Sequence, residues 1–158
     1  MARERDPAAP LKLGTVLDFM RLLWKMNHEL ESLSKRLVAS SGVTGPQRLV
    51  VRIVGRRPDI AAGELADILH MHPSTLTGIL ERLTRRGVLN RERDPEDGRR
   101  ILLALTARGR RVDTMRRGTV EAAIGRALRK FSEAQLAAAG EVLDAITDSL
   151  ADETEPEA

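Results

Sequence analysis

Cysteine is absent from this chain of 158 residues, and so is tyrosine. Without cysteine the protein forms no disulfide, no thiolate metal cluster and no Cys nucleophile, and it has no thiol-based oxidant sensor. Two Phe and one Trp are the only aromatic residues. Stacking of bases on aromatic side chains, which is common in proteins that bind single strands or RNA loops, is therefore not expected.

Long apolar runs are missing as well. No stretch approaches the roughly 18 apolar residues that a membrane span needs, and the first ten residues, MARERDPAAP, lack the apolar centre of a signal peptide. We therefore expect a cytoplasmic protein without membrane contact. The length fits one ordinary domain with a core of its own.

Positive charge is concentrated in one part of the chain. The formal net charge is +3, but the stretch from Arg82 to Arg117 holds twelve arginines and five acidic residues, a local net charge of +7. Four acidic residues near the C-terminus offset it: Asp152, Glu153, Glu155 and Glu157. A localised basic region indicates a polyanionic partner.

The stretch from Pro73 to Arg86 predicts a helix with two unlike faces. Its apolar residues recur at helical spacing and are expected to pack inward: Leu76, Ile79, Leu80 and Leu83. The opposite face carries hydroxyl groups in the first turn and arginines toward the end. Pro73 suits the first helical position and Gly87 the residue just past the end, so both ends of the helix are marked.

Helix-turn-helix spacing is indicated just before this stretch, because a short apolar-periodic segment ends at the connection His70–His72. After it, Val88-Leu89 and the alternating Ile101, Leu103 and Leu105 predict two strands. The turn signals Asp94-Pro95 and Asp97-Gly98 lie between them, so the strands form a ribbon with a basic tip, or wing. An arginine-rich helix face alone is usually only a solvated surface, but this combination favours DNA binding.

Each part of this unit fits a part of duplex DNA. Arginine can bond guanine bidentately in the major groove, and Ser or Thr can bond any base there. A cationic ribbon tip fits phosphates or the minor groove. Arg99 at the tip is the candidate for minor-groove insertion, with Asp97 orienting an arginine by a charge-assisted bond and Arg100 or Arg93 holding phosphates.

At these residues the chain resembles the MarR family of bacterial winged-helix transcriptional regulators, and the likeness extends over about residues 11 to 150. One departure is Ala61, where the family usually has a hydroxyl cap, and Asp59 is an alternative cap. The matching residues are Glu64-Leu65-Ala66, Pro73-Ser74-Thr75-Leu76-Thr77, Leu80, Leu83, Gly87, Arg91, Asp94, Asp97, Arg99, Leu105-Thr106 and Gly109.

The resemblance implies a mainly α fold with a small β-wing, in which a winged helix-turn-helix is flanked by long N- and C-terminal helices that form a dimerisation bundle. It further implies a regulator without a cofactor, expected to be a repressor, that acts as a homodimer on palindromic double-stranded DNA. It implies Arg82 as a base reader and Arg85 and Arg86 as backbone contacts. The expected DNA-binding residues are Pro73, Ser74, Thr75, Thr77, Arg82, Arg85, Arg86, Asp97, Arg99 and Arg100.

A small aromatic or anionic organic effector is also implied by the resemblance. The residues that could line its pocket are Met20, Trp24, Met26, Asn27, His28 and Met71. A Met and Trp stripe at helical spacing is more often plain core, so both interpretations stay open.

Amphipathic helices flank the winged unit. One is predicted over about 11–38, another over 107–130, and a third begins at the capping box Ser132–Gln135 and runs to about residue 150. We expect a flexible N-terminus (1–10), a dimerisation region (11–41 and 107–151), a DNA-binding domain (42–106) and a disordered acidic tail (152–158).

The helix opened by a second capping box, Thr44–Gln47, has an arginine-rich side that either contacts phosphates or is a solvated face: Arg48, Arg52, Arg56 and Arg57.

Three other functional hypotheses compete with that of a DNA-binding regulator without metal: catalysis, a metal-responsive regulator, and a winged helix that binds only protein. Catalysis is disfavoured, because His28, His70 and His72 have no recognisable Ser or Cys partner and no Gly-rich phosphate loop is present. A metal-responsive regulator using His70 and His72 is an alternative, although His72 can equally cap the helix that begins at Pro73. A winged helix that binds only protein would favour an acidic or apolar wing, and this wing is neither.

Overall fold

The structure is a computed structural model that describes residues 13–153. The flexible N-terminus predicted for 1–10 and the predicted tail beyond Glu153 lie outside the described residues. The chain divides into two compact units, Met1–Met115 and Arg116–Ala158. In the described part of the chain, no helix combines the length and the apolar character that a bilayer crossing requires.

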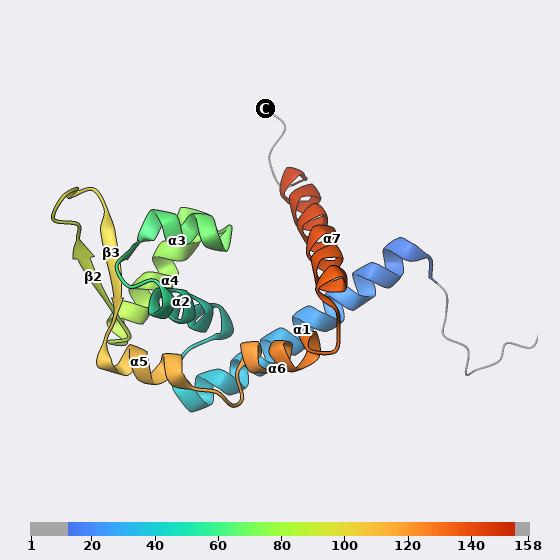
Figure 1. Ribbon diagram of the computed structural model, residues 1–158, viewed down its shortest axis with the longest axis horizontal. Coiled ribbons are helices and arrows are strands. Elements are labelled where there is room, and N and C mark those ends of the chain that lie inside the picture. The colour runs from blue at the N-terminus through green and yellow to red at the C-terminus, as the bar shows by residue number, and fades with distance from the viewer. Residues whose placement is uncertain (1–12, 154–158) are drawn as a thin grey trace, which may run out of the picture. The chain divides into compact units, whose positions relative to one another are not determined.

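The fold is mainly α with a small antiparallel sheet, as predicted (Figure 1). The first unit contains α1 (Thr15–Ser41), α2 (Gly45–Arg56), β1 (Ile60–Ala61), α3 (Ala62–Leu69), α4 (Pro73–Arg85), β2 (Leu89–Arg93), β3 (Ile101–Leu105) and α5 (Ala107–Thr114). The second unit contains α6 (Val120–Leu128) and α7 (Glu133–Asp152).

Local capping signals set most helix ends. Gly42 ends α1 in the left-handed region, with φ 76°, where a residue without Cβ is favoured. Both predicted capping boxes are confirmed: Thr44 and Gln47 open α2, and Ser132 and Gln135 open α7. In each box the hydroxyl accepts from the backbone three residues on and the glutamine reaches back, so two otherwise unbonded N–H groups are satisfied.

The sheet has three strands in the order β1-β3-β2, all antiparallel. The sequence predicted only the hairpin of β2 and β3, because two residues are too few to show a period. Ile60 pairs with Leu103, and this short strand ties the start of α3 to the wing. The alternative that Asp59 caps α3 is wrong: Ala61 is the N-cap residue without a side-chain bond, and the N–H of Asp59 donates to Leu103 O at 3.0 Å.

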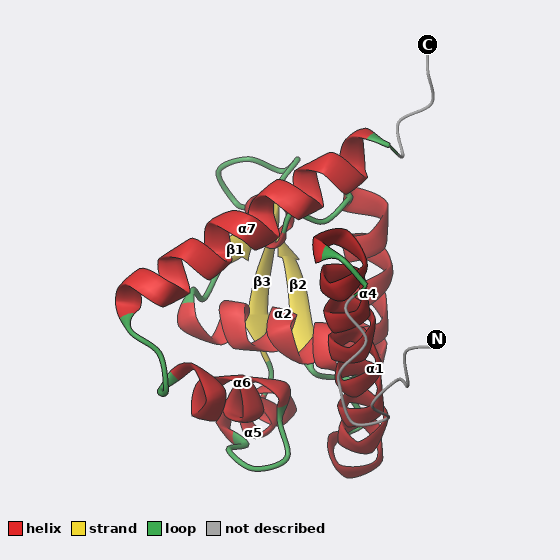
Figure 2. Cartoon of the chain, turned by 90° about the vertical axis from the view of Figure 1, so that its right-hand side faces the viewer, coloured by secondary structure: helices red, strands yellow, loops and turns green. Residues whose placement is uncertain are grey.

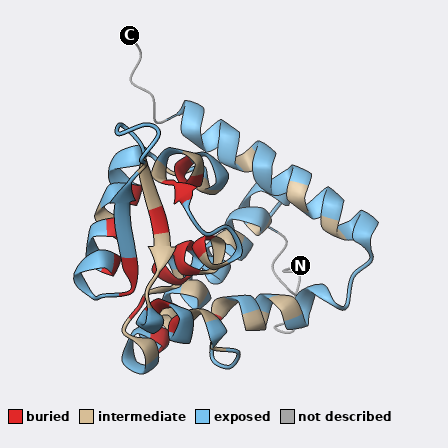
Figure 3. Ribbon diagram, turned by 60° about the vertical axis from the view of Figure 1, so that its left-hand side comes forward, coloured by how far each residue is buried: buried red, intermediate tan, exposed pale blue. Residues whose placement is uncertain are grey.

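The core lies between the sheet, α2, α3 and α4. Figure 2 shows α2 crossing the sheet, and α2 packs on β3. Figure 3 shows that the buried residues concentrate on the sheet and on the helices packed against it. The four apolar residues predicted for the inner side of α4 are all buried: Leu76, Ile79, Leu80 and Leu83.

The single helix predicted over 107–130 is wrong. The chain forms α5 and α6 instead, separated by a bend in which Gly118 has φ 71° and Thr119 caps α6 by accepting from the N–H of Ala122. α5 ends at its C-cap Met115, the chain turns at Gly118, and the new N-cap Thr119 starts α6. The apolar period runs on through the bend, so periodicity alone could not reveal it.

Close packing at Gly109 generates a test of the fold. This residue lies in the first turn of α5, where an added Cβ would overlap the carbonyl oxygen of Val88. We expect Gly109→Ala to lower the free energy of unfolding by about 2 kcal/mol or more, because backbone must move to make room. Denaturant unfolding measures the change.

Gly125 provides the matched control, since an added Cβ in α6 meets nothing within 4 Å. Gly125→Ala is expected to raise the free energy of unfolding by roughly 0.5–1 kcal/mol through helix propensity. Equal behaviour of the two variants would contradict the close approach of α5 to Val88.

Candidate nucleic-acid interface

The outward side of α4 is polar along its whole length. Because the opposite side is buried in the core, the helix cannot rotate, and the same residues always face solvent. All seven residues predicted for this helix and its C-cap are exposed: Pro73, Ser74, Thr75, Thr77, Arg82, Arg85 and the C-cap Arg86. The result is a rigid rod that presents hydroxyl groups at its N-terminal end and guanidinium groups at its C-terminal end.

Hydrogen bonds orient the hydroxyl groups of the first turn. His72 caps the helix, since its Nδ1 accepts from the N–H of Ser74 at 3.3 Å and lies 2.7 Å from Ser74 Oγ. Thr77 Oγ1 donates to Pro73 O at 2.8 Å. With its proton engaged inside the helix, the Thr77 oxygen faces outward as an acceptor, which suits amino groups on the edges of cytosine and adenine.

Gly78 also lies on this outward side, although it is not among the residues predicted from the sequence. An added Cβ there would meet only Arg82 Nη2, at 3.9 Å, so nothing inside the fold requires a glycine. The missing side chain lets another molecule approach the helix backbone closely between Ser74 and Arg82. The sequence pattern that could have identified this position is a glycine on the polar face of an amphipathic helix.

The wing is shaped by two aspartates. Asp94 Oδ1 accepts from the N–H of Glu96 at 2.9 Å and of Asp97 at 3.4 Å, and Asp94 Oδ2 lies 3.6 Å from the Arg100 guanidinium. Asp97 Oδ1 accepts from the backbone N–H of Arg99 at 3.1 Å. Asp97 thus reaches Arg99 through the backbone, whereas Asp94 forms the ion pair with a wing arginine. The tip is therefore held in a defined turn that exposes Arg99 and Arg100.

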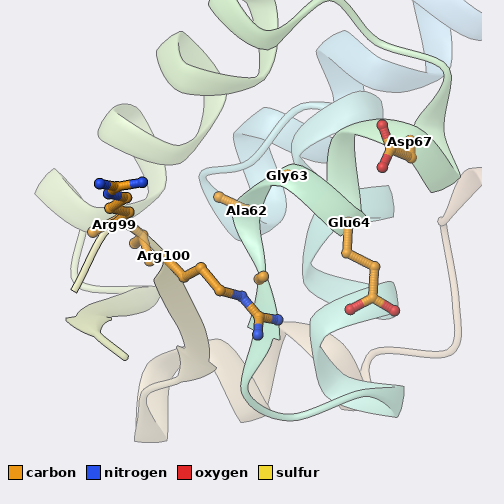
Figure 4. Close-up of a pocket in the computed structure, with 8 residues that line it drawn as sticks. Ala62, Gly63, Glu64, Asp67, Arg99 and Arg100 are labelled. Atoms are coloured by element: carbon orange, nitrogen blue, oxygen red, sulfur yellow. The ribbon is translucent and has the colours of Figure 1, made fainter. Parts of the chain in front are cut away.

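A pocket of about 420 Å³ separates the wing from α3. Figure 4 shows Arg99 and Arg100 on one side of it and Glu64 and Asp67 of α3 on the other. Glu64 is paired with Arg57, with 2.5 Å between Nη2 and Oε1. The pocket wall carries charges of both signs, so its electrostatic attraction for anions is concentrated on the wing side.

Two of the four α2 arginines take neither of the predicted roles. Arg48 is only 1% exposed and donates to the carbonyl oxygens of Val112 and Met115. Arg52 donates to Asp113, with 2.5 Å between Nη1 and Oδ1. Both interpretations, phosphate contact and solvated face, are therefore wrong for this pair. Instead, both arginines connect α2 to α5 and its C-cap by hydrogen bonds inside the protein. The sequence cannot reveal these bonds, because the acceptors lie more than 60 residues away.

The residues predicted for an effector pocket fall into two groups. Met71 lies in the connection between α3 and α4 and packs against the core. The others are exposed on α1, where Asn27 also donates to Glu31 at 3.2 Å. These five are Met20, Trp24, Met26, Asn27 and His28.

The described residues supply no ligand set for the alternative of a metal-responsive regulator that uses His70 and His72. Among residues 13–153 no group of three or more His, Cys, Asp or Glu side chains is placed to hold a metal ion. His72 is engaged as the cap of α4, and His70 ends α3 in the left-handed region with φ 48°.

Two packed helices in sequence, α3 and α4, followed directly by the β2–β3 hairpin, define a winged helix-turn-helix protein. Comparisons with known proteins agree. A family model described as MarR family matches residues 43–101. The transcriptional regulator HosA of Escherichia coli O111:H- is 33% identical over 98 residues, which are 59% of this chain and 73% of HosA.

The organic hydroperoxide resistance transcriptional regulator of Bacillus subtilis (strain 168) is 29% identical over 99 residues, which are 63% of this chain and 66% of that protein. A crystal structure of the PcaV transcriptional regulator from Streptomyces coelicolor in complex with its natural ligand superposes with a TM-score of 0.68 and 25% identity, covering 90% of this chain and 99% of PcaV. The chain belongs to the MarR family, and it is a transcriptional regulator rather than an enzyme.

The Asp94 turn makes the shape of the wing testable. We expect Asp94→Ala to speed hydrogen exchange of the Glu96 and Asp97 amides by about tenfold, because both lose their acceptor. The free energy of unfolding should change by less than about 1 kcal/mol, since the tip is exposed. Asp94→Asn is the control, because its amide oxygen still accepts. If exchange measured by NMR is equally fast in all three proteins, Asp94 does not hold the tip.

Proposed function

We propose that this regulator is a homodimer that binds double-stranded DNA sequence-specifically. The observation that carries the proposal is α4 itself, a helix held in the core by four apolar side chains while its other side is polar, with hydroxyl groups in the first turn, arginines toward the end and one carboxylate, Glu81, between them. A helix of this shape and chemistry fits the major groove, with its first turn toward the base edges.

Contacts to bases and to phosphates divide along α4. Ser74, Thr75 and Thr77 in the first turn are placed to contact base edges, and Pro73 begins that turn. Arg82 is the base reader among the arginines, while Arg85 and Arg86 neutralise phosphates.

The wing extends the contact beyond the major groove. Its tip presents Arg99 in a turn that Asp97 fixes, and Arg100 lies beside it. An arginine on a narrow ribbon fits the minor groove, where the negative potential is strongest. Arg99 enters that groove, and Arg100 and Arg93 hold the adjoining phosphates.

Exposed apolar surface supports the homodimer. Nine large apolar side chains between Leu13 and Val38 are exposed, and Trp24 is 65% exposed. In the second unit α6 and α7 each expose further apolar residues, among them Leu128 and Leu150. Surfaces of this kind mark interaction sites in soluble proteins. We propose a second copy of the chain as the partner, with residues 11–41 and 107–151 as the dimerisation region and 42–106 as the DNA-binding domain.

Dimerisation gives the binding site its symmetry. Two recognition helices related by a two-fold axis read half-sites about 34–36 Å apart, which is one helical turn of DNA. A site of this kind within a promoter excludes other proteins, so we propose a repressor.

Release by a small aromatic or anionic organic effector completes the proposal. The Streptomyces coelicolor relative was crystallised with its natural ligand, and here the Met and Trp residues of α1 offer an apolar surface beside the polar Asn27 and His28. An effector that prefers a geometry in which the two recognition helices no longer match successive grooves lowers the affinity for DNA.

Selection of bound sites from random duplex DNA tests the proposal. We expect a palindrome whose half-sites lie one helical turn apart, together with a dimer at micromolar concentration in sedimentation velocity. A monomer, or the absence of any enriched sequence, would contradict it. Enrichment of a single asymmetric site would contradict the symmetric dimer.

Arg82 and Arg99 form a matched pair of variants with different expected signatures. Arg82→Ala should cost on the order of 1–3 kcal/mol of binding free energy and relax the preference at one half-site position. Arg99→Ala should weaken binding to all sequences and flatten the dependence of affinity on salt, because a cation near phosphates is lost. Fluorescence anisotropy at several salt concentrations measures both. A uniform loss for Arg82→Ala would reassign Arg82 to the phosphates.

A further inference from the structure

Two arginines of α2, one helical turn apart, bond the last turn of α5. Arg48 Nη2 donates to Met115 O at 2.7 Å and its Nη1 donates to Val112 O. Arg48 is 1% exposed, which is rare for an arginine, since burying this charge is costly unless its donors are satisfied.

Arg52 completes the arrangement from the next turn of α2. Its Nη1 donates to the backbone oxygen of Asp113 at 3.0 Å and to the carboxylate at 2.5 Å. Gly55 follows on the same side of α2, and an added Cβ there would lie 2.9 Å from Asp113 Oδ2. The glycine thus makes room for the carboxylate. We call the set of Arg48, Arg52 and Asp113 the α5 clasp.

The α5 clasp supplies what the end of α5 lacks. The last carbonyl groups of a helix have no partner within it, and the C-cap Met115 has φ −59°, so no left-handed cap satisfies them. Guanidinium donors take that role here and complement the negative end of the helix. A helix of eight residues is also marginal alone. Its end is therefore held by α2 and not by its own length.

Met115 is also the last residue of the first compact unit. The chain therefore leaves the first compact unit, which carries the winged helix-turn-helix, at the residue whose carbonyl oxygen accepts from Arg48. The α5 clasp consequently holds the last residues of the body that carries α4 and the wing, at the point where the chain leaves it.

We propose that Arg48 and Arg52 are positioning residues for DNA binding, which set how the winged unit is presented to a half-site within the dimer. This inference rests on the proposed function. Neither residue touches DNA in the proposal, and both act through the end of α5. Loosening the α5 clasp changes the placement of one recognition helix relative to its symmetry mate and leaves each helix intact.

The test compares DNA affinity of the full chain on three duplexes: the selected palindrome, a single half-site, and the palindrome with one base pair inserted at its centre. For Arg52→Met we expect about tenfold weaker binding to the palindrome, half-site affinity within about twofold of wild type, and a smaller penalty for the inserted base pair. A merely structural defect in the winged unit would weaken the half-site as much as the palindrome.

Further variants keep the test decisive. Asp113→Ala removes the carboxylate from the other side of the α5 clasp and should weaken binding to the palindrome in the same way. It takes the place of Arg52→Met in the test if circular dichroism shows that Arg52→Met folds poorly. Arg52→Lys keeps a positive charge and N–H donors on one nitrogen, and it should recover most of the affinity.

Equal losses on half-site and palindrome, or no loss at all in Arg52→Met and Asp113→Ala, overturn the positioning role. Failure of the proposed function looks different. In that case the wild-type chain itself does not prefer the palindrome over the half-site.

Discussion

Burial of one side of α4 is the constraint on which the rest of the interface depends. Leu76, Leu80 and Leu83 are each at most 2% exposed, and each fully buried side chain of this size contributes roughly 1.5–3 kcal/mol. A helix fixed this way cannot rotate to hide its polar side or to expose its apolar side. Its orientation also fixes where β2 begins, because the chain turns at Gly87 directly into the wing. The packing of α4 against the core thus determines where the hydroxyl groups, the arginines and the ribbon lie.

Features with local causes were predictable from the sequence. The spacing of the leucines predicted which side of α4 faces inward. The hydroxyl and glutamine pairs at Thr44 and Ser132 predicted the starts of two helices, because a capping box involves only residues three apart. The turn signals at Asp94 and Asp97 likewise placed the wing. For the exposed side chains of α4 this was sufficient, since the side chains facing away from a packed helix follow from those that face inward, but Gly78 has no side chain and was missed.

Features with distant causes were not predictable. β1 is two residues long and exists only because Leu103 offers a partner. The bend before α6 interrupts an apolar period that continues on both sides. The sequence pattern predicts Arg48 at the surface, yet this residue is buried, because carbonyl groups more than 60 residues away accept hydrogen bonds from its guanidinium. The function of such a residue becomes visible only when the chain is folded.

Separation of the two sides of α4 has a consequence for how regulators of this shape diversify. Residues such as Thr75 and Arg82 contribute little to the stability of the fold, since substitutions at exposed positions usually change it by no more than about 0.5 kcal/mol. New operator preferences can therefore arise by exchange of a few outward residues without any need for compensating changes in the core. One scaffold can accordingly serve many promoters, and gene duplication can yield regulators with distinct targets in few mutational steps.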